Sequence, residues 1–397
     1  MAVPVLRSTN FTNTRRLDFS DVAIRWFSAE RAVRFDIRAS DVLVERSGGG
    51  PTQPVGRVVV AERALPEYGF SNFVQLLRID EGEMDPDFVA WCLARLHQSG
   101  LIERLQHQTT QMRNLDLRDY MRVLLPKPPR EEQERIAVAL SSADLASVRL
   151  EQLLAAIDRL RRAVLQQLFS RGLPGQHQDF TETQIGVIPS GWDVMRLKSL
   201  IARIEAGASP LCEGHPARAG RWGVLKVSAV SWDAFDEREN KELPSTIEPD
   251  LRAEVRAGDL IVSRANTTGL CGAAQIVRHL NSKLLLCDKT WRVVPAPGIE
   301  PEWLVLLLKS QATRRQIAAI ATGTSDSMKN VSQRDFRRMW VALPPEGERR
   351  TAVGICRALD VYRDSVIAQA LRLNSVGRSL LQNLTVGRVR LAEVVPA

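Results

Sequence analysis

The sequence predicts an α+β protein in which one arrangement occurs twice: a mixed αβ domain, then a long helix. Short β-branched segments such as DVLVE (41–45), GRVVVAE (56–62) and DLIVS (259–263) are bounded by Gly, Pro or Asp, which is typical of strands. A proline-rich turn leads into a helical pattern at LPKPPREEQERIAVAL (125–140) and again at ALPPEGERRTAVGICRALD (342–360). Prolines end a strand ladder, and the acidic residues that follow favour the first turn of a helix.

The two halves match along most of their length. The proline turns are 216 residues apart, from Pro128 to Pro344, and the same offset places Met112 on Met328 and Asn114 on Asn330. Segments further upstream match in the same order at offsets of about 215 to 219: PDFVAWCLA (86–94) with PEWLVLLLK (301–309), SDVLVER (40–46) with GDLIVSR (258–264), and VLRST (5–9) with VLKVS (224–228). The first copy starts at the counterpart of Val224, so residues 185–222 have no counterpart. We expect either a start further upstream or a shortened first domain.

Each long helix carries an apolar stripe in the same register, at steps of three and four residues. A helix of ~40 residues is ~60 Å long, more than one small domain covers. We therefore predict that the helices pair as an antiparallel coiled coil with pseudo-twofold symmetry, the alternative being that each lies along its own domain. The stripes are Leu150, Leu154, Ile157, Val164 and Leu168, and Val366, Ala370, Leu373, Leu380 and Leu384.

The predicted boundaries follow from these patterns. They are a first αβ domain at 1–128, a helix at 129–172, a linker at 173–184, a second αβ domain at 185–345, a helix at 346–388 and a tail at 389–397.

Composition favours a polyanionic partner inside the cell. The net charge is +8, and each phosphate contact made by Lys or Arg releases counterions. Five scattered cysteines without a CxxC pair indicate reduced thiols, hence a cytoplasmic protein. No apolar run reaches the ~18 residues that span a bilayer, so we expect no membrane association.

The sequence shows no motif for catalysis. It contains no P-loop, no dinucleotide-binding glycine loop and no Asn/Asp-Pro-Pro-Tyr/Phe motif. The closest approaches to a nuclease centre, Asp41 with Glu45 and Asp250 with Glu254, are interpreted as strand-edge charges. Cys212-x-x-His215 has no second ligand pair at zinc spacing. We predict no catalytic residue and no metal in this chain.

Two kinds of segment in each half carry side chains suited to DNA. Arg and Lys pair with guanine, and Asn and Gln pair with adenine. The loops HQTTQMRN (107–114) and TGTSDSMKN (322–330) are of this kind, and so are the residues that follow the strands DVLVE and DLIVS; solvated loops and tight turns are the alternatives. The candidates are Arg46, Ser47, Gly48, Thr109, Thr110, Gln111, Arg113 and Asn114, and Arg264, Asn266, Thr267, Thr268, Thr324, Ser325, Lys329 and Asn330.

These features together resemble the specificity (S) subunits of type I restriction–modification systems. LLPKPPREEQERIA (124–137) is similar to the family's passage from a target recognition domain into a spacer helix. TETQIGVIPSGWDVMRL (181–197) resembles its entry into the second recognition domain, and SGGGPTQPVGRVV (47–59) resembles a loop and strand of some first domains. One departure is that Gln133 of the first joint corresponds to Arg349 in the second.

The resemblance implies a non-catalytic subunit. Each target recognition domain would read one half of an asymmetric, bipartite double-stranded DNA target. The helices would set the spacing and bind two methyltransferase subunits, and restriction/translocase subunits would join. S-adenosylmethionine, ATP and Mg²⁺ would belong to those partners, with no cofactor in this chain. The alternatives are a recognition subunit of a methylation-only or phage-defence complex, or a duplicated small-ligand or polysaccharide-binding protein.

Overall fold

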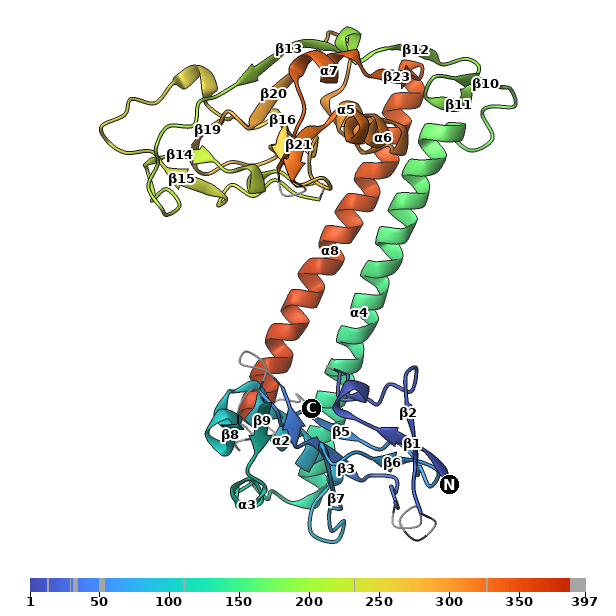
Figure 1. Ribbon diagram of the computed structural model, residues 1–397, viewed down its shortest axis with the longest axis vertical. Helices are drawn as coiled ribbons and strands as arrows, with labels where there is room; N and C mark the ends of the chain where they lie inside the picture. The colour runs from blue at the N-terminus through green and yellow to red at the C-terminus, as the bar shows by residue number, and fades with distance from the viewer. Residues whose placement is uncertain are drawn as a thin grey trace, which may run out of the picture. The chain divides into compact units, whose positions relative to one another are not determined.

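The computed structural model describes residues 1–12, 14–28, 30, 35–49, 54–109, 112–231, 233–325 and 328–385. It divides into two compact units: unit 1 comprises Met1–Ala155 with Asp364–Ala397, and unit 2 comprises Ala156–Arg363. Each unit therefore contains one αβ domain and part of each long helix (Figure 1). The boundaries predicted from the sequence placed each long helix in a segment of its own. The units divide both helices because each domain buries apolar side chains against both of them.

The described part of the unit 1 domain contains three small sheets. In each, a central strand pairs with two neighbours, and all pairs are antiparallel except β1 with β6. The sheets are β2 (Ala23–Trp26), β1 (Ala2–Leu6), β6 (Gly69–Phe70); β5 (Val58–Val60), β3 (Val42–Glu45), β7 (Val74–Leu77); and β4 (Ser47–Gly48), β9 (Met112–Leu115), β8 (Gln106–Thr109). The helices are η1 (Ser8–Asn10), α2 (Pro86–Gln98), η2 (Leu101–Leu105) and α3 (Leu117–Tyr120).

The domain of unit 2 repeats this strand order and adds to it. The corresponding sheets are β15 (Asn240–Glu242), β14 (Trp222–Leu225), β19 (Lys283–Leu285); β18 (Ala274–Ile276), β16 (Leu260–Ser263), β20 (Thr290–Pro295); and β17 (Ala265–Asn266), β22 (Met328–Asn330), β21 (Thr322–Ser325). The additional strands are β10 (Phe180–Thr183) with β11 (Gly186–Pro189), β12 (Asp193–Arg196) with β23 (Trp340–Leu343), and β13 (Ile201–Ala206) beside β20. The helices are η3 (Leu197–Leu200), η4 (Val227–Ala229), η5 (Leu251–Ala253), α5 (Pro301–Lys309), α6 (Gln311–Ile320) and α7 (Gln333–Arg338).

Strands β12 and β13 are the main difference between the two domains. They belong to the stretch 185–222, upstream of the part of unit 2 that aligns with residues 5–128. In the described part of unit 1, β7 pairs with β3 alone, whereas its counterpart β20 pairs with both β16 and β13. Residues 124–127, the counterpart of β23, form no strand, and Leu124 is 96% exposed.

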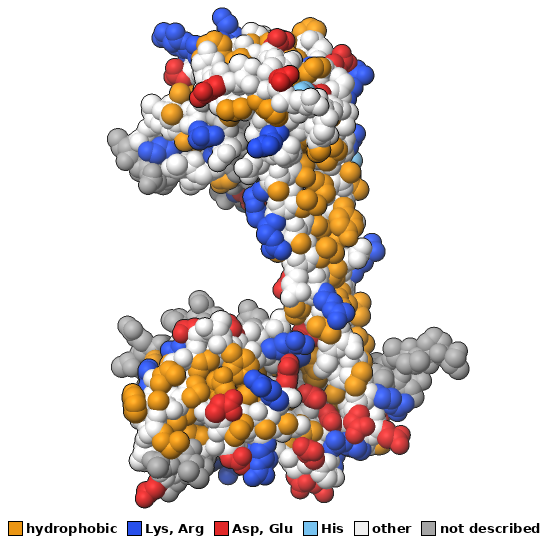
Figure 2. Space-filling view, turned by 90° about the vertical axis from the view of Figure 1, so that its right-hand side faces the viewer, with side chains coloured by type: hydrophobic (Ala, Val, Ile, Leu, Met, Phe, Trp, Pro, Cys, Tyr) orange, Lys and Arg blue, Asp and Glu red, His pale blue; other side chains and the backbone are white. Residues whose placement is uncertain are grey.

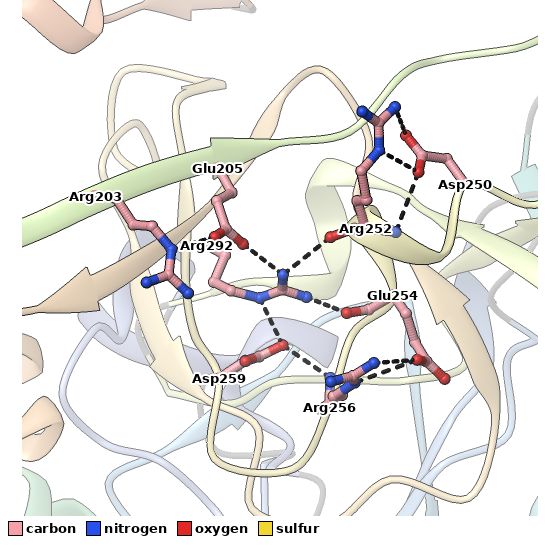
Figure 3. A network of polar contacts seen from close by, with 8 residues as sticks. All are labelled: Arg203, Glu205, Asp250, Arg252, Glu254, Arg256, Asp259 and Arg292. Carbon is pink, nitrogen blue, oxygen red and sulfur yellow. Dashed lines mark hydrogen bonds and ion pairs between the residues drawn. The ribbon is translucent and has the colours of Figure 1, made fainter.

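An arginine on β20 attaches β13 to the sheet of unit 2 (Figure 3). Arg292 donates to Glu205 of β13 (2.6 Å) and to Asp259 (2.9 Å), and it also donates to the carbonyl of Arg252. Hydrogen bonds from Arg203 and Arg292 lower the pKa of Glu205. In unit 1 the strand register places Leu76 at the position of Arg292. The sequence of β7 therefore lacks the group that would hold a β13 equivalent electrostatically.

The long helices are α4 (Arg130–Arg171) and α8 (Glu346–Leu384). They contact each other in both units, antiparallel. In unit 2, Arg161 pairs with Asp360 (2.7 Å) and Asp158 with Arg363 (2.8 Å); in unit 1, Ser147 donates to Asn374 (3.2 Å). In each of these three pairs the two residue numbers add to 521, which is the constant register expected of two antiparallel helices.

Two of these contacts correspond to each other under the 216-residue offset of the repeat. Adding 216 to 147 gives 363, and subtracting 216 from 374 gives 158, so Ser147–Asn374 and Asp158–Arg363 occupy corresponding positions. All ten stripe residues predicted from the sequence are buried or half-buried. Coiled-coil packing and pseudo-twofold symmetry remain predictions.

The two joints between domain and helix use different side chains for one purpose. Buried Gln133 donates to the carbonyl of Pro128 (2.9 Å) and accepts from the backbone N–H of Asp85, the N-cap of α2 (2.8 Å). At the second joint, buried Arg349 donates to the carbonyl of Pro344 (2.9 Å) and to the carboxylate of Glu300, the N-cap of α5 (3.0 Å). Each residue thus ties the proline turn to the start of the domain's central helix.

The stretch 173–184, which the sequence predicts as a linker, contacts the domain of unit 2 over part of its length. Leu173 is buried, and Phe180–Thr183 forms β10. The buried carboxylate of Glu348 holds the segment: it accepts from the Leu173 N–H (3.0 Å) and the Trp192 Nε1 (2.9 Å), and it contacts His177 (2.9 Å). Pro174 with Gly175 predicted a turn and a linker here, and the carboxylate of Glu348, distant in sequence, supplies a hydrogen-bond partner to this stretch.

Candidate nucleic-acid interface

In unit 1 the third sheet joins the two candidate segments of that domain. Strand β4 follows β3 directly and pairs with β9, which places Ser47 opposite Asn114 and Gly48 opposite Arg113. Strand β8 pairs with the other edge of β9, from Gln106–Leu115 to Thr109–Met112. Segments about 60 residues apart in the chain therefore form one surface.

Unit 2 builds the same sheet from the corresponding segments. Strand β17 follows β16 and pairs with β22, which places Ala265 opposite Asn330 and Asn266 opposite Lys329. Strand β21 pairs with the other edge of β22. The stretches predicted as loops, 107–114 and 322–330, are β-hairpins in their described parts. Their threonines suit strands, a β-propensity that the loop prediction overlooked.

The structure does not describe every candidate side chain. Thr110 and Gln111 are outside the described residues. For Thr109, Thr324 and Ser325 the structure describes the backbone in β8 and β21 and not the side chains.

Several candidates face the interior. Asn266 is 7% exposed, and its amide donates toward Ser263 Oγ (3.3 Å), while its Oδ1 accepts from the Thr267 N–H (2.8 Å). Ser47 is likewise 7% exposed. Arg264 donates from Nε to the carbonyl of Asp288 (2.6 Å). The sequence placed these side chains among the DNA contacts. In the structure the side chains of Asn266 and Arg264 form hydrogen bonds beside the end of β16.

Other candidates reach the surface of each sheet. Arg46 in unit 1 and Thr267 and Thr268 in unit 2 are exposed, whereas Arg113, Asn114, Lys329 and Asn330 are half-buried. Gly48 has a φ of +128°, a backbone conformation that favours glycine. It brings the chain from the buried strand to the surface sheet.

Two arginines that the sequence did not single out position these surfaces. In unit 1, Arg57 forms two hydrogen bonds to the buried Glu45 (2.9 and 3.0 Å) at the end of β3. In unit 2, Arg314 of α6 donates to the carbonyls of Cys271 (2.6 Å) and Gly269 (3.1 Å). This loop follows Thr267 and Thr268. No local pattern marks either arginine, because each acts on a segment distant in sequence.

A methionine occupies the same position in each hairpin. Met112 begins β9 and Met328 begins β22, and they are 42% and 37% exposed. The sequence signal for this position was that the two methionines align under the 216-residue offset. Apolar side chains of this kind contact thymine methyl groups or wedge between bases.

The carboxylates considered for a nuclease centre are paired with arginines. Asp41 contacts Arg78 (2.7 Å), and Glu254 contacts Arg256 (2.9 Å). Among the described residues, no group of three or more His, Cys, Asp and Glu side chains is placed to hold a metal ion. Within the same residues, no helix has the length and apolar character needed to cross a membrane.

Comparison with known proteins identifies similar chains, although no family model matches. The specificity subunit of the type I restriction enzyme EcoEI from Escherichia coli is 35% identical over 160 residues, which are 40% of this chain and only 27% of that relative. The specificity subunit of EcoKI from E. coli K12 is 25% identical over 398 residues, covering 96% of this chain and 81% of the relative.

Solved structures show a related fold. The S subunit of a type I restriction–modification system from M. genitalium has a TM-score of 0.57 at 15% identity, covering 97% of this chain and 92% of that chain. A chain from a study of complex assembly and conformational transition of the type I system has a TM-score of 0.55 at 15% identity, covering 97% and 91%.

Proposed function

We propose that this chain, which belongs to the specificity subunits of type I restriction enzymes, is a DNA-recognition subunit whose two αβ domains each read one half of a bipartite target. The observation that carries the proposal is the equivalent sheet in each domain, β4-β9-β8 and β17-β22-β21. Because the two sheets carry different side chains, the two half-sites differ and the target is asymmetric. The net charge of +8 favours the phosphate backbone.

The exposed and half-buried side chains of these sheets suggest how each half is read; the Lys329 ammonium donates to the Gly323 carbonyl (2.9 Å) within its hairpin. Arg46 and Arg113 in unit 1 are suited to guanine or phosphate, and Asn114 to adenine. Lys329 and Asn330 in unit 2 offer the same chemistry. The hydroxyls of Thr267 and Thr268 suit either phosphate or base edges.

The test is a map of methylated adenines in cells that carry this chain and its methyltransferase partner. A split motif is expected. Arg113→Ala should relax one half of the motif and Lys329→Ala the other, since a good base contact contributes about 1–3 kcal/mol of discrimination. Arg159→Ala, an exposed arginine on α4, is the matched control and should leave the motif unchanged. A contiguous motif, or one that both substitutions relax in the same half, would contradict the proposal.

We further propose that α4 and α8 bind two methyltransferase subunits and set the spacing between half-sites. Leu160 and Val376 support this: they correspond under the 216-residue offset, and each is 52% exposed. Figure 2 shows hydrophobic side chains along the exposed surface of these helices. Equivalent apolar positions of this kind suit two copies of one partner.

Charge substitutions at these two positions test the docking. Leu160→Asp and Val376→Asp should each remove one of two methyltransferase subunits from the cytoplasmic complex, as measured by native mass spectrometry. Arg162→Asp on α4, also exposed, is the control. Methyl transfer, with S-adenosylmethionine, and ATP- and Mg²⁺-dependent cleavage by restriction/translocase subunits would be activities of those partners. A complex that keeps both subunits in both variants would refute the docking.

A further inference from the structure

Asp144 of α4 is a half-buried carboxylate where the long helix meets the first domain. It accepts a hydrogen bond from Arg15 (3.4 Å), which lies in the loop between η1 and β2. The guanidinium of Arg15 also lies over the ring of Trp91 in α2, 3.1 Å from the ring centroid. Trp91 in turn donates from Nε1 to Ser141 Oγ of α4 (3.1 Å). One arginine of the loop therefore contacts both helices where they pack together.

The environment of Arg15 is unusual for a loop arginine. Its φ is +57°, in the left-handed region that favours glycine. Its side chain is 16% exposed, and burial lowers the pKa of Arg15 to about 10, although Asp144 and Asp87 act in the opposite direction. Burial also raises the pKa of both carboxyls. A strained residue with a desolvated charge persists only where the surrounding contacts fix it.

The loop that carries Arg15 has a counterpart in unit 2. Phe11 and Leu17 form an isolated antiparallel bridge across the first loop, and Val230 and Phe235 form one across the second. The first loop follows η1 and the second follows η4. The two loops therefore occupy corresponding places in the two domains.

The loop of unit 2 presents the opposite charge to the long helices. Its Asp233 lies 4.0 Å from Arg161 of α4. Arg161 also pairs with Asp360 of α8 (2.7 Å), and Asp360 corresponds to Asp144 under the 216-residue offset. In unit 2 a helix therefore supplies the arginine and the loop supplies a carboxylate, whereas in unit 1 the loop supplies the arginine.

The position that would hold a helix arginine in unit 1 is a glycine. Arg161 corresponds to Gly377 under the same offset. Gly377 also lies opposite Asp144 in the helix register, because these two residue numbers add to 521 as the contacting pairs do. A Cβ at residue 377 would have open space around it, and a cavity of about 120 Å³ lies between Gly377, Asp144 and Trp91. Asp144 therefore takes its arginine from the loop.

The same loop is attached to the candidate DNA-reading sheet of unit 1. The guanidinium of Arg57 donates to the carbonyl of Phe11, where the loop begins (2.9 Å). This guanidinium also holds the carboxylate of Glu45 at the end of β3, directly before β4. A connected series of polar contacts therefore runs from α4 through the Arg15 loop to the sheet β4-β9-β8.

We propose that Arg15 is a positioning residue for the first half-site: by binding Asp144 and Trp91, it fixes the sheet β4-β9-β8 relative to α4. The proposal rests on the proposed function, because it takes this sheet to read DNA. Arg15 itself contacts the helices and acts on DNA only through the loop and Arg57.

Hydrogen exchange of the full chain without DNA tests the attachment. Arg15→Asp places a carboxylate beside Asp144 and should release the loop. Exchange should become about tenfold faster at the N–H groups of Asp18 and Leu115, which donate to the carbonyls of Asn10 and Arg46. Unchanged exchange at the N–H of Val89 in α2 would show that the domain remains folded.

A second substitution should rescue the first. Gly377→Arg in the Arg15→Asp chain recreates the arrangement of unit 2, with the carboxylate on the loop and the arginine on the helix. Both exchange rates should return to within about twofold of those of the parent. Gly354→Arg in the Arg15→Asp chain is the matched control, because Gly354 is another glycine of α8 with open space at its Cβ. It adds the same charge and helix propensity and should leave exchange fast.

Methylation maps in cells that carry the methyltransferase partner test the positioning role. Arg15→Asp should leave the bases of the motif unchanged and allow methylation at sites whose halves are one base pair closer together or further apart. Gly377→Arg should restore the parent spacing. A mere loss of stability would instead lower methylation at all sites equally.

The outcomes separate this proposal from the proposed function. If Gly377→Arg does not restore exchange, Arg15 does not anchor the loop, whatever the chain does with DNA. Restored exchange with an unchanged spacing would overturn the positioning role and leave the reading of two half-sites intact. A contiguous motif in the parent would overturn the proposed function and the positioning role together, while the exchange rates would still decide whether Arg15 anchors the loop.

Discussion

Substitution of Arg349 by alanine tests whether the second joint holds domain and helix together. The side chain is 6% exposed, and its three donors reach the carboxylate of Glu300 (3.0 Å) and the carbonyls of Pro344 (2.9 Å) and Gly298 (2.8 Å). Removing one partner of a buried pair typically costs about 3–5 kcal/mol. Glu300 is 24% exposed and also lies 3.9 Å from Arg350. This exposure and second partner reduce our expectation to about 2–4 kcal/mol.

The assay is urea-induced unfolding of the full chain, followed by tryptophan fluorescence. Arg349→Gln should lose less stability than Arg349→Ala, because a glutamine can donate to the Pro344 carbonyl as Gln133 does to Pro128. Arg350→Ala is the control: its side chain is 71% exposed, so its effect should stay within about 0.5 kcal/mol. If Arg349→Ala costs no more than Arg350→Ala, the joint does not depend on this arginine and our reasoning is refuted.

Three further predictions concern the helices and the buried charges. Leu154→Asp combined with Leu373→Asp should abolish assembly with the methyltransferase in size-exclusion chromatography while both domains stay folded; Arg162→Asp, at an exposed position of α4, is the control, and a surviving complex contradicts helix pairing. Glu348→Gln should destabilise the chain by about 1–3 kcal/mol in urea, because an amide group then faces three donors; the exposed Glu346→Gln should be neutral. Burial lowers the pKa of Lys309 to about 8, with Arg161 adding to the effect. Between about pH 8 and 10.5 the unfolded chain therefore binds the proton more tightly, and this residue's contribution to stability rises with pH. Lys309→Met should flatten that rise in unfolding experiments at pH 7 and pH 10, and an unchanged slope would show that the lysine is not desolvated.

The arrangement of the chain was largely accessible from the sequence because duplication leaves marks that survive divergence. Offsets of about 215 to 219, close to the 216 residues from Pro128 to Pro344, also aligned strands of both domains, and the ten stripe positions are all buried or half-buried. The joints show what remained hidden. The replacement of Gln133 by Arg349 at the second joint was interpreted from the sequence as a departure from the family pattern. In the structure both side chains connect a proline carbonyl to a helix N-cap.

The candidate interface was only partly predictable. Composition located the segments, and strand pairing brought them together. The direction of each side chain depends on contacts that no local pattern encodes. Asn266 has the chemistry of a base-reading residue, but its amide lies within the turn beside Ser263. Arg314 has no motif, yet it holds the loop that presents Thr267 and Thr268.

The joints have a consequence for recombination between related genes. Gln133 contacts the N-cap Asp85, and Arg349 contacts the N-cap Glu300, so each joint residue matches the helix of its own domain. A crossover at the proline turn would separate these partners and leave a buried arginine opposite a backbone N–H, or a carboxylate opposite a glutamine. A crossover further along the helix, beyond residue 133 or 349, would carry the matched pair together. Exchange of whole domains between genes should therefore leave its breakpoints inside the long helices.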